Sequence, residues 1–223
     1  MTSLWSKTVS ILRGESATRD GLANLSVPML LCLIFLCGSV YGAAMGSYNA
    51  AGSPRLLQSL YSAVKVPFLI VATFCLSLPS FFILNTVFGL RDDFRLALRV
   101  LLSSQAGQMA LLASLTPYVL LWNASSSVHE VTILFNGLMF GISTLGGQMI
   151  LRRAYRTLIV QDPRHRILLR VWVVTYAFVG IQLGWTLRPF VGDPRAATAF
   201  LRADSLTNAY VALFEIIRRA LRL

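Results

Sequence analysis

The stretch Val27–Gly46, VPMLLCLIFLCGSVYGAAMG, decides the fold because it holds no charged side chain over twenty residues. A helix of about 20 mainly apolar residues covers the roughly 30 Å hydrocarbon layer of a bilayer. The apolar run is longer than the core of a signal peptide, and the predicted span is preceded by 24 residues rather than by a short basic start. We therefore expect a retained membrane span over about residues 25–46.

The same pattern recurs along the 223 residues, of which 56% are hydrophobic and 13% charged. This composition lies outside the range of ordinary soluble domains. Charged side chains are absent from residues 21–54, 66–90, 100–129, 131–151 and 171–187. The sequence predicts an all-α polytopic transmembrane bundle with about five spans, at 25–46, 63–87, 98–121, 131–151 and 168–188. Between the first two spans, residues 47–65 predict a turn followed by a short surface helix.

Amphipathic segments flank the predicted bundle. In residues 1–24, one helical face carries Leu4, Trp5, Val9 and Leu12, which is typical of a helix lying at the membrane interface. In residues 191–223, a second apolar face predicts an amphipathic helix on the outer leaflet or against the bundle, with a sixth span as the alternative. Its members are Tyr210, Leu213, Phe214, Ile217 and Leu221. The domain boundaries are thus 1–24, 25–190 and 191–223.

The basic residues predict the orientation, because cytoplasmic loops carry an excess of Lys and Arg. One side holds Lys7, Arg13, Arg19, Arg91, Arg95, Arg99, Arg152, Arg153, Arg156, Arg164, Arg166 and Arg170, and the other only Arg55 and Lys65. We expect a multi-pass protein of the cell membrane with a cytoplasmic N-terminus and the C-terminus on the opposite side. The net charge of +11 then indicates contact with membrane lipids rather than with nucleic acid.

The turn FGLRDDFRLALRVLL, Phe88–Leu102, carries the densest group of charges between two apolar stretches. Asp92 and Asp93 could serve a lipid enzyme at head-group level, but no second acidic cluster supplies further ligands. We favour a turn in which Gly89 ends one span and Asp92 or Asp93 caps the next helix. The predicted lipid or interface anchors are Arg91, Arg95, Arg99, Trp185 and Arg188.

Small and polar residues inside the spans are the remaining candidates. The GxxxG pattern lets membrane helices approach closely, and it occurs at Gly38, Gly42 and Gly46, at Gly137 and Gly141, and at Gly180 and Gly184. We expect spans one, four and five to pack together through these glycines, or some of these faces to bind a partner. The intramembrane polar residues are Gln105, Gln108, Asn136, Gln148 and Gln182. They predict hydrogen bonds between helices or, alternatively, a polar path for a solute.

Reactive groups are sparse. Cys32, Cys37 and Cys75 fall in apolar spans, and His129 and His165 lie beside loops, so the spacing predicts no metal or cofactor site. No GxSxG or HExxH motif occurs. We expect no enzymatic activity.

The order of features in VFGLRDDFRLALRVLLSSQAGQMALLASLTPYVLLW, residues 87–122, resembles the bacterial members of the Yip1-like membrane protein family. The resemblance covers about residues 60–190. It implies about five spans, a cytosolic N-terminus and a C-terminus across the membrane. The Asp-Leu-Tyr-Gly-Pro type motif of the eukaryotic members is absent, so no role with small GTPases is implied.

The favoured hypothesis is a non-enzymatic scaffold or accessory subunit of a membrane complex, in a bacterial inner membrane. Its expected partners are membrane lipids and either further copies of the chain or another membrane protein. The alternative is a small transporter or channel subunit whose polar path is lined by the amides.

Overall fold

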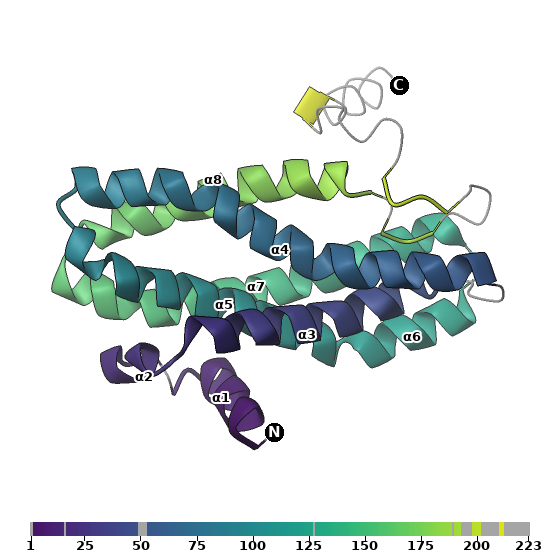
Figure 1. Ribbon diagram of the computed structural model, residues 1–223, viewed down its shortest axis with the longest axis horizontal. Coiled ribbons are helices and arrows are strands. Elements are labelled where there is room, and N and C mark those ends of the chain that lie inside the picture. The colour runs from purple at the N-terminus through teal and green to yellow at the C-terminus, as the bar shows by residue number, and fades with distance from the viewer. Residues whose placement is uncertain are drawn as a thin grey trace.

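The computed structural model describes residues 2–15, 17–48, 53–126, 128–188, 190–192, 198–201 and 210–211. The regular elements in these residues are all helices, which confirms the predicted all-α class. In chain order they are α1 (Thr2–Arg13), α2 (Arg19–Ala23), α3 (Val27–Gly46), α4 (Ser53–Val87), the 3-10 turn η1 (Arg91–Asp93), α5 (Phe94–Ser114), α6 (Thr116–Ser125), α7 (His129–Gln161) and α8 (His165–Thr186) (Figure 1). Of the predicted C-terminal helix, only Tyr210 and Val211 are described, and both are helical; its other residues lie outside the described part.

Five helical segments of the described chain are long and apolar enough to cross a membrane. They are Val27–Gly46, Leu56–Val87, Arg91–Ser125, His129–Gln161 and His165–Thr186. The predicted five-span bundle of a multi-pass membrane protein is thereby confirmed.

Helix α4 differs from the prediction. It is one continuous helix from Ser53, where a separate short surface helix was expected before the span, and it runs through Pro67 and Pro79. One face of its N-terminal half is buried, at Gln58 and Ser62, while Leu56, Leu60 and Val64 on the same segment are exposed. Ser59 Oγ donates to the carbonyl of Ala43 on α3 at 2.6 Å. Gln58 Nε2 and Ser62 Oγ both donate to the carbonyl of Phe190, beyond the end of α8. The polar groups of this segment are thus bonded within the protein.

The third and fourth spans also differ in their bounds. The helix predicted over 98–121 is interrupted at Leu115, and α6 starts there with Pro117 in its first turn, where the missing proline N–H costs no hydrogen bond. Helix α7 continues ten residues beyond the predicted end at 151, to Gln161. At about 1.5 Å per residue, α7 is longer than the hydrocarbon layer is thick, so one end extends into the head-group region.

The helices pack around α3, α4 and α5. Helix α3 lies along α4 and α5, α7 packs on α5, and α8 packs on α4 (Figure 1). The ring of Trp172 on α8 is buried and makes edge contacts with Phe74 and Phe81 of α4, at 5.4 and 5.2 Å between centroids. This aromatic cluster ties the last span to the bundle.

Helix α1 packs against the bundle through one face. Thr8 and Ile11 are buried, and α1 lies against α5. Trp5, which was assigned to the apolar face, is 73% exposed. Ile11 rather than Trp5 therefore packs against the bundle, and the position of α1 at the membrane interface stays a prediction.

Candidate functional site

Three of the intramembrane amides form hydrogen bonds between helices. Tyr176 Oη donates to Gln105 Oε1 at 2.9 Å, Tyr41 Oη donates to Asn136 Oδ1 at 3.0 Å, and Gln108 Nε2 donates to Thr144 Oγ1 at 3.1 Å. These bonds join α8 to α5, α3 to α7, and α5 to α7. Gln105, Gln108 and Asn136 are all buried. An amide already bonded to a neighbouring helix has less capacity left to bind a solute.

The other two amides are placed differently. Gln148 faces inward on α7, and its Oε1 is buried with no hydrogen-bond partner in the described part of the chain. Gln182 is half-buried on α8. The three bonded amides therefore lie at three different helix contacts rather than along one path.

The glycines fall into two groups. On α3, an added Cβ at Gly42 would overlap the carbonyl oxygen of Ser62, and one at Gly46 would lie 2.7 Å from Ser59 Cα. Gly38 approaches Pro67, at 3.0 Å from its Cβ. The α3 glycines thus pack against α4, and the prediction that spans one, four and five pack together through them is wrong. The GxxxG motif places small residues on one face of a helix, but it does not determine which helix packs against that face.

The remaining glycines have more space. An added Cβ at Gly180 would make ordinary contact with Thr73, at 3.4 Å. At Gly137, Gly141 and Gly184, no described atom lies within 4 Å of that position. Gly137 and Gly141 are exposed on α7.

The acidic turn contacts the last hairpin. Asp93 stands at the N-cap position of α5 but makes no side-chain capping bond, so the predicted capping role is wrong for Asp93. Its Oδ2 instead lies 3.4 Å from His165 Nε2, and His165 Nδ1 lies 3.5 Å from Tyr155 Oη. His165 and Tyr155 are fully buried, so neither can touch a soluble substrate in this conformation. This chain of contacts joins η1, α7 and α8. Gly89 follows α4 with a φ of 72°, as the predicted helix end requires.

The α7–α8 turn is held by its own ion pair. Arg164 Nη2 lies 2.6 Å from Asp162 Oδ2, and the Arg164 backbone N–H also donates to this carboxylate at 2.8 Å. These hydrogen bonds lower the pKa of Asp162 to about 2. Arg164 Nη1 also donates to the carbonyl of Phe88 at 2.8 Å, which ties the α4–α5 and α7–α8 turns together.

The predicted anchors lie at both ends of the bundle. Arg91 and Arg95 are exposed beside η1, and Arg99 is half-buried further along α5. At the other end, the Arg188 guanidinium lies 3.3 Å from the centroid of the Trp185 ring, and Arg188 Nε donates to the Trp185 carbonyl at 3.0 Å.

Lys65 is a buried charge that the sequence did not reveal. It was counted with the loops because it borders a charge-free stretch, but it lies inside the apolar segment of α4 and is fully buried. Its Nζ is 4.8 Å from the centroid of the Phe200 ring and 6.0 Å from that of Phe190. Cation–π contacts of this kind stabilise a buried ammonium.

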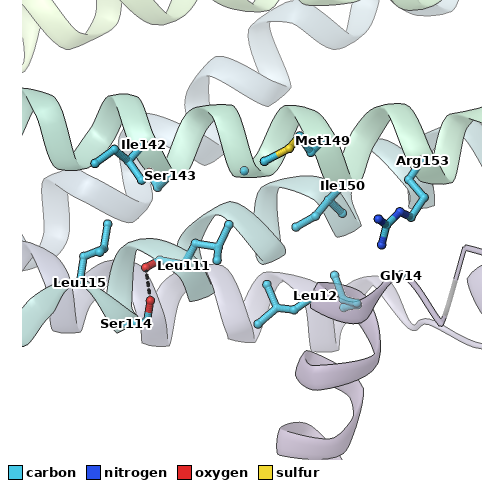
Figure 2. Close-up of a pocket in the computed structure, with 12 residues that line it drawn as sticks. Leu12, Gly14, Leu111, Ser114, Leu115, Ile142, Ser143, Met149, Ile150 and Arg153 are labelled. Carbon is cyan, nitrogen blue, oxygen red and sulfur yellow. Dashed lines mark hydrogen bonds between the residues drawn. The ribbon is translucent and has the colours of Figure 1, made fainter.

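A recess of about 400 Å³ lies between α1, α5 and α7 (Figure 2). Its walls are mainly apolar, with Leu111 and Ile150 among them, and Arg153 stands at one end beside Gly14. Arg153 Nη1 donates to the Arg13 carbonyl at 3.0 Å, and Ser114 Oγ is bonded to the Leu111 carbonyl. The recess suits an acyl chain or an apolar side chain better than a polar solute.

Comparison with known protein families, with curated protein sequences and with solved structures finds no match. The resemblance to bacterial Yip1-like proteins stays a prediction. The geometry of the bundle is therefore the basis for a functional proposal.

Proposed function

We propose that the protein is a non-enzymatic scaffold or accessory subunit of a membrane complex, which binds a transmembrane helix of another subunit on α7. The observation that carries this proposal is the open space over Gly137 and Gly141. These residues are four apart, so they lie on one face of the helix.

The surroundings of the two glycines suit a helix partner. Leu134, Leu138 and Leu145 flank them and are 72%, 58% and 67% exposed. Small residues framed by larger apolar ones let a second backbone approach closely, so that van der Waals contacts stabilise the pair in lipid. We name the surface formed by these five residues, Leu134, Gly137, Leu138, Gly141 and Leu145, the α7 glycine face.

The α3–α4 contact illustrates what such a face does in this protein. Gly42 and Gly46 bring the two backbones together so closely that no side chain fits between them. The α7 glycine face has the same spacing but no counterpart within the described chain. A transmembrane helix of another subunit is the partner whose apolar surface matches this face.

The bonding of the amides favours this proposal over the transporter hypothesis. Gln105, Gln108 and Asn136 are engaged between helices inside the bundle. Bonds of this kind hold membrane bundles together, typically at under about 2 kcal/mol each. The hydrogen bonds of these three amides are better explained by a role in helix assembly than by a role in passing a solute.

The test is purification of the full chain in mild detergent, followed by mass spectrometry of the proteins that remain bound. The double variant Gly137→Leu, Gly141→Leu fills the face, and Gly184→Leu is the matched control because that glycine is also open. We expect one membrane protein to copurify with the wild type and the control, but not with the double variant. A monomer that binds nothing, a partner retained by the double variant, or a complex of identical chains would each contradict the proposal.

A further inference from the structure

A second surface of α7, distant from its glycine face, borders a groove of about 910 Å³ between α7 and α8. Four arginines line it: Arg152 and Arg156 from α7, and Arg166 and Arg170 from α8. All four are exposed, and the other lining residues are apolar. The groove therefore combines a fourfold positive charge with an apolar wall, and no acidic residue of the described part of the chain lines it.

The position of the four arginines along α7 and α8 sets their depth in the membrane. Arg152 directly follows the charge-free stretch 131–151, and Arg170 directly precedes the charge-free stretch 171–187. These two residues therefore mark the edge of the hydrocarbon layer. Arg156 and Arg166 lie four residues farther out, which is about 6 Å along a helix. The basic part of the groove thus lies at head-group level.

The apolar part of the groove lies on the hydrocarbon side of the arginines. Val173 and Val174 line the groove on the hydrocarbon side of Arg170. Val174 is 69% exposed, so an acyl chain can lie directly against it. Along α8 the groove changes from a basic to an apolar lining, in the same order as a phospholipid changes from head group to chain.

We propose that this groove binds an anionic phospholipid, with its phosphate between the arginines of the two helices and an acyl chain along Val173 and Val174. Guanidinium groups match phosphate oxygens in paired, charge-assisted hydrogen bonds. Basic pockets between transmembrane helices bind the head groups of anionic lipids in this way. The bound lipid links two helices that make few direct contacts with each other. This inference does not depend on whether the α7 glycine face binds a partner.

The experiment uses the full chain in detergent micelles with phosphatidylcholine and phosphatidylglycerol, and native mass spectrometry counts the lipids bound to each protein molecule. We expect phosphatidylglycerol, and not phosphatidylcholine, to remain bound to the wild type. The variant Arg156→Gln, Arg170→Gln should bind it about tenfold more weakly, since it removes charge-assisted contacts from both helices. The control Lys7→Gln, Arg13→Gln removes the same charge from α1, outside the groove, and should bind as the wild type does.

Two further arms separate a lipid from other anions and from a folding defect. Val174→Trp keeps all four arginines and obstructs the chain, so it should also reduce retained phosphatidylglycerol. Added inorganic phosphate should not displace the lipid. Equal losses in the groove double variant and the α1 double variant, full binding by Val174→Trp, or displacement by inorganic phosphate would each overturn the proposal.

Discussion

Gly42 and Gly141 show that the same residue in the same motif has two different roles. Gly42 lies against the backbone of α4, where a Cβ would overlap the Ser62 carbonyl oxygen. Gly141 has open space in front of it. The first glycine fixes the distance between two helices of the bundle, and the second leaves a face that another helix can fill.

The contrast predicts different effects of one added methyl group. Gly42→Ala should destabilise the protein by about 1–3 kcal/mol, because α3 and α4 must separate to accommodate the Cβ. Gly184→Ala, at an open position, should leave stability unchanged or slightly raise it, since alanine favours a helix more than glycine does. Thermal unfolding in detergent, followed by tryptophan fluorescence, measures both. Equal melting temperatures for the two variants would contradict the close contact at Gly42.

The candidate residues were predictable from sequence, but their neighbours were not. The spacing placed Gln105 and Gln108 on one face, and both are buried. Their partners, Tyr176 and Thr144, come from helices far along the chain. Periodicity specifies a face of one helix, whereas the identity of the neighbour depends on how all helices pack.

At the level of the elements, α4 shows where sequence reasoning fails. The prediction began the second span at residue 63 and counted Lys65 with the connection before it. The helix instead continues to Ser53, because α3 and the aromatic rings near Lys65 surround its polar groups. The five spans themselves follow from long charge-free stretches, and these were predicted.

The hydrogen bonds between elements can be tested at the α5–α8 contact. Tyr176→Phe keeps the ring beside Trp172 but removes the hydroxyl that donates to Gln105. We expect a loss of under about 2 kcal/mol, and a smaller added loss when Gln105→Leu is combined with it. Tyr118→Phe, on an exposed side chain, is the control and should have no effect. Fully additive losses in the double variant would contradict the bond.

At the scale of the whole molecule, the turns gather at the two ends of the bundle. The α4–α5 and α7–α8 turns meet at one end, where Arg164 binds the Phe88 carbonyl. The α6–α7 connection lies at the other end with the end of α3, because Asn123 Nδ2 donates to the Ala44 carbonyl at 2.8 Å. This arrangement agrees with alternating membrane crossings, and the basic residues predict that the first end is cytoplasmic.

Labelling of single cysteines tests that orientation. In a chain with Cys32, Cys37 and Cys75 replaced by alanine, cysteine is introduced at Asp92, at Gln161 or at Ser125, which are all exposed. An impermeant maleimide added to intact cells should label only the Ser125 variant, and all three should react after lysis. Labelling of the Asp92 variant from outside would reverse the predicted orientation.

Cross-linking in native membranes tests most directly whether the α7 glycine face binds a helix of another subunit. In the same cysteine-free chain, Gly141→Cys and, as a control, Gly184→Cys carry a photoactivatable maleimide, since both positions are open. We expect one discrete protein adduct from the Gly141→Cys variant, and we expect this adduct to be absent from the Gly184→Cys variant. Lipid adducts alone at both positions, or the same protein adducts from both, would contradict it.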